Sequence, residues 1–123
     1  MNDDELNALT EKVIGCAFEV SNTLGAGFLE KVYENAIAIE LRKNGLDVKQ
    51  QAPVSVLYDG IVVGEYFADL LVSDAVIVEL KAVKEFSDAH TAQCLNYLKV
   101  TALPICLLLN FGKPRVEVKR YRL

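Results

Sequence analysis

Two carboxylates and one ammonium interrupt an otherwise apolar stretch of the chain, EYFADLLVSDAVIVELKAVKEF, at residues 65–86. These residues are Asp69, Glu79 and Lys81, and the last two stand in a segment whose neighbours are Val, Ile and Leu. Burying an unpaired charge costs several kcal/mol or more. The three groups therefore either reach water at an edge of the fold or share a task that compensates for that cost.

The spacing of these residues can place all three on one face of a sheet. If residues 73–75 form a three-residue loop between antiparallel strands, Asp69 stands directly opposite Glu79, with both side chains on the same face. Lys81 lies two residues beyond Glu79 and shares that face. A two-residue loop would instead pair Asp69 with Val78 and turn Glu79 to the other face. The three-residue register makes a compact cluster of two acids and one base.

Such a cluster has a chemical and a structural interpretation. Two carboxylates this close repel each other unless a cation joins them, and carboxylate oxygens suit a hard ion such as Mg²⁺. A nearby lysine can hold or activate a water, or offset the charge that builds on a phosphate. The structural alternative is an ion-pair network at a strand end, in which Lys81 bridges the two acids. Spacing alone leaves both interpretations open.

The elements that must position these residues follow from the hydrophobic periodicity. Apolar residues at three- and four-residue steps predict a first helix, which begins with an acidic turn at residues 3–5 and ends at the glycines of LGAG, residues 24–27. A second helix follows and ends at Gly45. A third helix is predicted over residues 88–101, with Ser87 as its N-cap.

Between and after these helices the period changes to that of strands. Asp59-Gly60 is a strong hairpin signal, and Pro53 marks an edge or a bend. The strands are predicted over residues 47–51, 54–58, 61–72, 76–82 and 105–111, and a last strand carries Val116 and Val118. Because a helix crosses between the fourth and fifth of these segments, they should be parallel neighbours. The sequence thus predicts an α/β (α+β) fold with a mixed central sheet flanked by helices.

Length and composition set further limits. The 123 residues, 52% of them hydrophobic and 24% charged, predict one soluble domain spanning residues 1–123. No apolar run approaches the roughly 20 residues that span a bilayer, and the acidic N-terminus lacks the apolar region of a signal peptide. Cys16, Cys94 and Cys106 are odd in number and widely spaced, as expected of small buried hydrophobes in a reducing compartment. We therefore expect a cytoplasmic protein that does not bind a membrane.

Charge is unevenly distributed along the chain. The net charge is −4, yet residues 111–123 carry five bases and one acid. The net charge argues against a general nucleic-acid coat protein, whereas the basic tail could be an edge that faces phosphate. An equally good interpretation is a solvated last strand with charged residues on its edge.

An acid, nine intervening residues and then Glu-x-Lys on adjacent strands, followed by a helix, resembles the PD-(D/E)XK nuclease superfamily. The core of that superfamily is a helix, three antiparallel strands, a helix and a strand, so the resemblance implies a restriction-endonuclease-like core. Ala68-Asp69 stands at its Pro-Asp position, without the proline. LGAGFLEKVYENAI, residues 24–37, is similar to the signature of the GxxExxY protein family, small bacterial and archaeal proteins assigned to the same superfamily, through Gly27, Glu30 and Tyr33. Tyr33 is expected to be a packing ring with a hydrogen-bonding hydroxyl rather than a catalytic group.

Carried over by position, the resemblance implies a metal site and a catalytic set. Asp69, Glu79 and Glu30 would bind Mg²⁺ or Mn²⁺. Lys81 would be the catalytic lysine, acting with Asp69 and Glu79. Glu34 lies one turn after Glu30 on the same side of the second helix and competes for its role, although the family motif favours Glu30.

The third helix offers further candidates. Gln93 and Tyr97 match the Q-x-x-x-Y spacing that many nucleases of the superfamily carry there, with the Gln touching the site and the Tyr supporting it or contacting DNA. Gln93 is therefore a candidate catalytic residue and Tyr97 a candidate DNA contact. His90, one turn earlier, could approach phosphate or be a surface or capping residue. The candidate contacts to the nucleic-acid backbone are Lys84, Lys113 and Arg115.

Two classes of function follow from these residues. The first is a Mg²⁺-dependent nuclease that hydrolyses phosphodiester bonds of nucleic acid, with DNA as the expected substrate. The alternative is a catalytically silent module with a nuclease fold that binds nucleic acid or a protein partner. All the expected acid and lysine positions are filled, which favours the enzyme. The acidic surface and the absence of an evident recognition domain favour a narrow substrate or a protein partner that delivers it. A homodimer is a further candidate.

Overall fold

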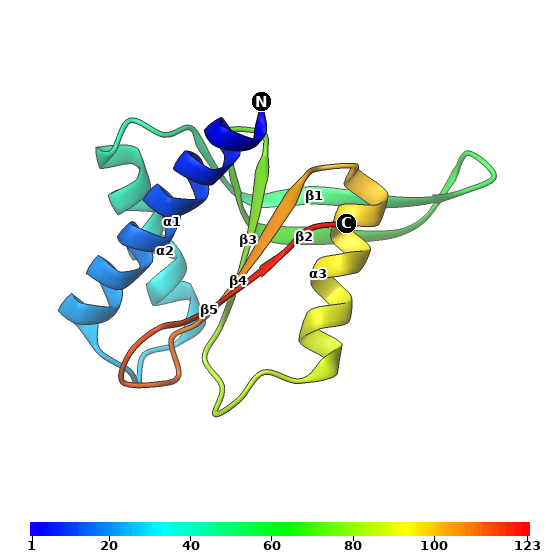
Figure 1. Cartoon of the computed structure of the whole chain (residues 1–123). Helices are drawn as coiled ribbons and strands as arrows, with labels where there is room; N and C mark the ends of the chain where they lie inside the picture. Colours follow the sequence, from blue (N-terminus) through cyan, green and yellow to red (C-terminus); the bar gives the residue numbers. More distant parts are fainter.

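Three helices flank a five-stranded mixed sheet (Figure 1). This computed structural model describes residues 1–123. The elements in chain order are α1 (Asp3–Leu24), α2 (Glu30–Lys43), β1 (Val48–Tyr58), β2 (Ile61–Val72), β3 (Val76–Lys81), α3 (Asp88–Thr101), β4 (Ile105–Asn110) and β5 (Glu117–Tyr121). The predicted α+β class, with a mixed central sheet between helices, is confirmed. None of the helices has the length and apolar character needed to cross a membrane.

Local sequence explains where the helices begin and end. α1 starts after Asn2, whose side chain accepts a hydrogen bond from the Glu5 N–H at 2.8 Å, while the Glu5 carboxylate accepts one from the Asn2 N–H. The periodicity of apolar residues does not reveal this cap. α2 ends at Lys43, and Gly45, the predicted residue just beyond the helix cap, has a φ of +76°, which favours glycine. The predicted cap of α3, Ser87, accepts a hydrogen bond from the His90 N–H.

The strands lie in the order β1-β2-β3-β4-β5. Val72 stands opposite Val76, which confirms the three-residue loop at residues 73–75. α3 crosses from β3 to β4, and these two strands are parallel, as predicted. Their register sets Lys81 opposite Asn110 at the carboxyl ends of both strands.

Two separate cores hold the sheet. On one face, α1 and α2 bury a large cluster that includes Val78 and Leu80 of β3. On the other face, α3 buries a smaller cluster that includes Ile77. Because side chains alternate along a strand, Glu79 and Lys81 project to the α3 side. The three cysteines are buried and free, as expected of small apolar groups: Cys16, Cys94 and Cys106.

β1 is one continuous strand rather than the two predicted segments. It runs through Pro53, which is tolerated because β1 is an edge strand of the sheet. Gln51, just before this proline, has a φ of +53°. The partner strand changes face at the same level, since Ala68 packs in the core under α3 whereas Leu70 packs in the core under α1 and α2. At the level of Gln51 and Asp69, the hairpin therefore twists so strongly that the opposite face of each strand turns toward α3.

The loop after β3 is fixed by residues at the end of β4. Asn110 is fully buried, donates a hydrogen bond to the Val83 carbonyl at 2.9 Å and accepts one from the Val83 N–H at 3.0 Å. Gly112 lies against the same segment, and a Cβ on it would stand 2.3 Å from the Val83 carbonyl oxygen. Glycine is required at this position because two backbone segments touch.

Gly112→Ala should therefore destabilise the fold, because the added methyl group forces these segments apart. We expect the free energy of unfolding, measured by urea denaturation, to fall by about 1–3 kcal/mol. Gly15→Ala is the matched control: it lies within α1, and no atom beyond the neighbouring turns of the helix backbone lies within 4 Å of the added Cβ. That variant should instead be more stable by about 0.5–1 kcal/mol, owing to the better helix propensity of alanine. Equal effects at the two positions would contradict the close approach at Gly112.

Candidate active site

The candidate site lies where β2 and β3 part. Their pairing ends at Leu70 and Val78, and the next pair in this register would be Asp69 and Glu79. Here the carboxylates bridge the gap between the strands: the Asp69 N–H donates to Glu79 Oε1 at 3.2 Å, and the Leu80 N–H donates to Asp69 Oδ2 at 2.8 Å. The two acids are thus neighbours across the strands, as the three-residue loop requires.

Glu79 is held in surroundings that favour its neutral form. The residue is only 3% exposed. Burial raises the pKa of Glu79 to about 9, and the charge of the neighbouring Asp69 carboxylate acts in the same direction. Lys81 opposes this effect but contributes less to the pKa. With no cation bound, Glu79 therefore carries a proton at neutral pH.

Lys81 ends β3 beside these acids without pairing with either of them. The residue is half-buried, and its ammonium takes part in none of the ion pairs of the chain. The structural alternative, in which Lys81 bridges Asp69 and Glu79, is therefore not observed. An ammonium without a protein partner is available to a water molecule or a phosphate.

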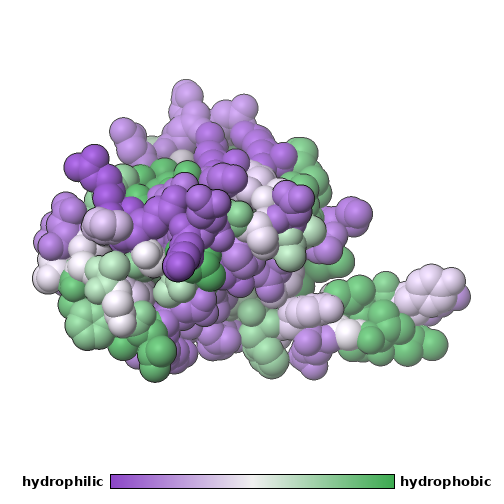
Figure 2. Space-filling view, turned by 90° about the horizontal axis from the view of Figure 1, so that it is seen from below, coloured by the Kyte–Doolittle hydropathy of each residue, from purple (hydrophilic) through white to green (hydrophobic).

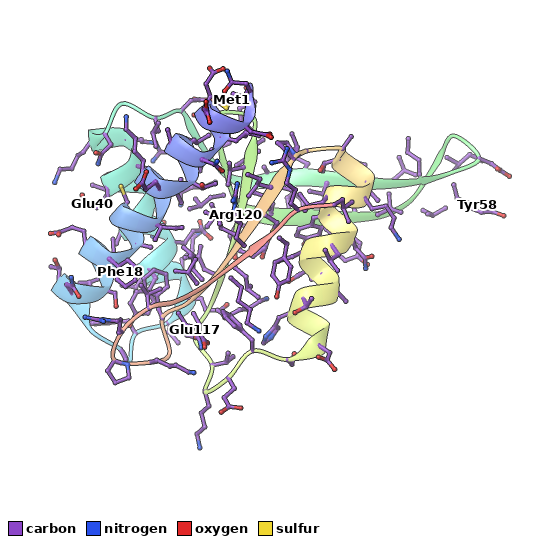
Figure 3. The ribbon with its side chains drawn as sticks, viewed as in Figure 1. Met1, Phe18, Glu40, Tyr58, Glu117 and Arg120 are labelled. Carbon is purple, nitrogen blue, oxygen red and sulfur yellow. The ribbon has the colours of Figure 1, made fainter.

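Glu117 adds an acid to the same row of the sheet. Lys81 stands opposite Asn110, and Asn110 stands opposite Glu117, so the three side chains lie in one row across β3, β4 and β5. Glu117 Oε2 binds the Lys113 ammonium at 3.3 Å, whereas its Oε1 is buried and has no hydrogen-bond partner. Figure 3 shows this residue at the start of β5, toward the loop that follows β3. The sequence carries no signal for Glu117, because the row depends on the register of β4.

The spacing of Gly27, Glu30 and Tyr33 has a structural explanation. Tyr33 is fully buried, and its hydroxyl donates to the Gly25 carbonyl at 2.6 Å and accepts from the Phe28 N–H at 3.2 Å. Gly27 adopts a φ of +111° in the same loop, a conformation that favours glycine. Tyr33 is therefore the predicted packing ring with a hydrogen-bonding hydroxyl, and it fixes the turn from which α2 starts.

Glu30, the first residue of α2, reaches the end of β3. Its Oε1 accepts a hydrogen bond from the Ala82 N–H at 3.2 Å, directly after Lys81. α2 packs on the face of the sheet opposite to α3. Glu30 therefore reaches the end of β3 from the α2 face of the sheet, whereas Glu79 lies on the α3 face.

Glu34 is connected to the Asp69 end of the site, through the side chain of Gln51. The residue is 3% exposed. It accepts hydrogen bonds from Gln51 at 2.6 Å and from Gln50 and Lys31, both at 2.7 Å. The same amide nitrogen of Gln51 lies 3.4 Å from Asp69 Oδ1. Gln51 thus links Glu34 to Asp69. Its backbone is in the left-handed conformation, which is often found at functional sites. No local sequence signal predicted this conformation.

The three predicted metal ligands, Asp69, Glu79 and Glu30, are not gathered into one group. No cluster of three His, Cys, Asp or Glu side chains in the chain is arranged to hold a metal ion. Each of the three carboxylates instead accepts a main-chain N–H, and Glu30 comes from the opposite face. Asp69 and Glu79 fit a hard ion by donor type, because both offer carboxylate oxygens side by side. The role of Glu30 as a third ligand stays a prediction.

Gln93 and Tyr97 lie over the α3 side of the site. Gln93 donates a hydrogen bond to the Tyr97 hydroxyl at 3.2 Å. Burial raises the pKa of Tyr97 to about 12, and the charges of Glu79 and Asp69 add to this effect. His90 acts as a capping residue, because its Nδ1 accepts a hydrogen bond from the Ser87 N–H at 3.1 Å.

The predicted phosphate contacts lie in the two loops at the carboxyl ends of β3 and β4. Lys113 is paired with Glu117. Lys84 and Arg115 are exposed and take part in no ion pair. Because Asn110 joins the two loops, these bases lie at the same end of the sheet as the candidate site.

Glu79→Gln should change how stability depends on pH. A carboxyl whose pKa is about 9 in the folded chain and ordinary in the unfolded chain binds more protons when folded. Its stabilising effect is complete below the unfolded pKa and is lost as the pH rises toward the folded one. The free energy of unfolding of the wild type should fall by up to about 1.4 kcal/mol per pH unit in that window. Glutamine cannot ionise, so the variant should lack this slope.

The measurement is urea denaturation at several values between about pH 5 and pH 8. Glu65→Gln, at an exposed position on β2, is the control and should keep the slope of the wild type. Identical slopes in Glu79→Gln and the wild type would contradict the raised pKa.

Comparison with protein families assigns the chain to a superfamily. The family described as the PD-(D/E)XK nuclease superfamily matches residues 7–121, from within α1 to the last residue of β5. No curated protein and no solved structure matches at a significant level. The predicted superfamily is thereby confirmed, and the narrower GxxExxY family stays a prediction. With its mixed sheet between helices, a restriction-endonuclease-like fold, the chain belongs to the PD-(D/E)XK nuclease superfamily.

Proposed function

We propose that this chain is a nuclease that hydrolyses phosphodiester bonds of DNA with Mg²⁺ or Mn²⁺ as its cofactor. One observation carries the proposal: Asp69 and Glu79 are neighbours at the point where β2 and β3 part, and the unpaired ammonium of Lys81 follows two residues later. Stability alone would favour apolar residues here, because a buried pair of acids is costly. Membership of a nuclease superfamily supports the same reaction class.

Each residue of the site has a role in this proposal. A bound divalent ion supplies a water of lowered pKa as nucleophile and positive charge for the phosphate. Asp69 and Glu79 hold the ion through their carboxylate oxygens. The Lys81 ammonium positions a water or offsets the charge that develops on the phosphate in the transition state. Glu30 supports the end of β3 through the Ala82 N–H, which keeps Lys81 in place.

The substrate would approach the carboxyl ends of β3 and β4. Lys84 and Arg115 lie exposed in the loops at this end and take part in no ion pair, so they are available to phosphate. The net charge of the chain is −4, which weakens general attraction to nucleic acid. Binding would therefore depend on these few bases and on the bound ion.

Ion binding should displace the proton of Glu79 and so become tighter as the pH rises. Below the pKa of about 9, the affinity should increase by up to about tenfold per pH unit. In millimolar Mg²⁺ or Mn²⁺, the melting temperature of the wild type should therefore rise more at pH 8 than at pH 6. Asp69→Asn should lose this increase, whereas Asp47→Asn, at an exposed position before β1, should retain it. A shift of the same size in Asp69→Asn and the wild type would place the ion elsewhere.

Lys81→Ala and Glu79→Gln should lose turnover by about 10²-fold or more while still folding, because each removes charge that acts in the transition state. Gln93→Ala should lose less, because a neutral side chain at the rim orients rather than carries charge. His90→Ala should change turnover little, since His90 caps α3. The matched control is Lys12→Ala, an exposed lysine on α1, which should cleave like the wild type.

The assay should use DNA and RNA substrates with Mg²⁺ or Mn²⁺, and all variants should be purified identically to control for contaminating nuclease. Cleavage of RNA alone would correct the proposed substrate. Equal cleavage by the wild type and Lys81→Ala would mean that the activity does not come from this site. The alternative, a catalytically silent module that binds nucleic acid or a protein partner, would then be the better interpretation.

A further inference from the structure

The outer half of the β1–β2 hairpin, residues 54–67, forms a two-stranded arm whose base packs under α3 through Val54 and whose outer part leaves the body of the molecule (Figure 1). β2 pairs with β3 only from Leu70 to Val72, so this hairpin arm has no third strand on either edge. An isolated two-stranded ribbon is at best marginally stable in water. A second surface is therefore expected to cover the arm.

The arm is apolar on both faces. Seven of its apolar side chains are more than half exposed: Leu57, Tyr58, Ile61, Val62, Val63, Tyr66 and Phe67. Figure 2 shows the arm projecting from the body with apolar side chains along it, and Figure 3 shows Tyr58 at its far tip. Exposed apolar patches of several hundred Å² usually mark interaction sites.

The charge of the arm indicates what kind of surface covers it. Residues 54–67 contain two acids, Asp59 and Glu65, and neither Lys nor Arg. Nucleic-acid phosphates and anionic membrane surfaces are both bound through basic side chains. An apolar arm with acidic residues instead fits a protein surface that is apolar and carries a positive charge.

Such a surface lies on the chain itself, beside the base of the arm. A groove of about 520 Å³ runs between α3 and the hairpin. Val56 and Tyr66 line it from the hairpin, and Ala92 and Val100 line it from α3. Among the lining residues there is one cation, Lys99, and no acid.

We propose that two copies of this chain form a symmetric dimer in which the arm of each copy lies in the α3 groove of the other. One two-fold axis satisfies both arms and both grooves, because each copy supplies the same two surfaces. Tyr66 lines the chain's own groove, and the other six exposed apolar side chains of the arm offer on the order of 600 Å² per copy. The groove of each copy adds to this, which brings the area near the roughly 800 Å² that each partner contributes to a stable interface. The acid at the tip, Asp59, complements the groove that contains Lys99.

The dimer also covers the α3 side of the candidate site. Gln93 and Tyr97 line the same groove, and Tyr97 packs in the core under α3, on the side of the sheet to which Glu79 projects. An arm in the groove shields this side from water and leaves the end of the sheet near Lys81 open to substrate. The dimer itself does not depend on nuclease activity, so it can be tested separately.

The test is the oligomeric state of the full chain, measured by sedimentation equilibrium at micromolar concentrations. The wild type should be a dimer. Val62→Glu on the arm and Ala92→Glu in the groove should each raise the Kd by about a hundredfold or more, because the symmetric interface buries the new carboxylate twice. Ile39→Glu is the matched control, since Ile39 is 58% exposed on α2, and it should leave the Kd unchanged. Circular dichroism melts check that each variant folds.

Mixing the two monomeric variants distinguishes this arrangement from any other dimer. In the mixed pair, the intact arm of the Ala92→Glu copy meets the intact groove of the Val62→Glu copy. The mixed dimer therefore has one contact without any substitution and one contact that carries both substitutions. In a dimer of either variant alone, both contacts carry a substitution. The mixed dimer should therefore be at least about tenfold tighter than either variant alone. A wild type that stays monomeric at about 100 μM, dissociation by Ile39→Glu, or no gain on mixing would each overturn the proposal.

Discussion

An exchange of hydrogen bonds between two carboxylates and two main-chain N–H groups marks the place where the sheet divides. Asp69 and Glu79 make it at the level where β2 stops pairing with β3. Buried main-chain donors left unpaired would be costly, and the carboxylates satisfy them. β2 can therefore leave the sheet and continue into the hairpin arm. The same two acids lie where the strand pairing ends, next to the base of the arm, and form the centre of the candidate site.

A chain of contacts ties this site to the helices. Tyr33 stacks on Phe111, with ring centroids 4.6 Å apart. The Phe111 N–H donates to the Lys81 carbonyl at 2.8 Å, and Gly112 lies against the loop that follows. The start of α2 and the ends of β3 and β4 are thus one packed unit. The tyrosine of the GxxExxY-like motif therefore positions the site rather than takes part in its chemistry, and Glu30 ties α2 to the same strand end.

Several features of the site oppose stability. Glu79 is buried and neutral at the cost of its usual ionisation, Gln51 has a left-handed backbone, and Glu117 leaves one buried oxygen without a partner. Buried acids, left-handed backbone and unpaired buried oxygens are typical of functional sites, where the requirements of function oppose stability. All three features lie at or next to the end of β3 or the twist of the hairpin. Their common location supports the view that this region is selected for function.

The order and type of nearly every element could be predicted from local sequence. The signals involved each extend over only a few residues, so they can be interpreted without knowing the fold. They are the hydrophobic period, the glycine after α2 (Gly45), the cap of α3 (Ser87) and the turn at residues 73–75. The sequence allowed a two- or a three-residue turn there, and the observed pairing of Val72 with Val76 selects the register that sets Asp69 opposite Glu79. The parallel pairing of β3 and β4 followed from the crossover helix.

The environment of the site residues could not be predicted in this way, because it forms only when distant segments pack together. Gln51 reaches Asp69 only because the hairpin twists, and Glu117 joins the row of Lys81 only through the register of β4. Glu30 comes from the far face of the sheet because α2 packs there. Burial, strand register and helix packing bring together residues far apart in the chain, and the pKa of a carboxyl depends on all of them at once. No local pattern contains that information.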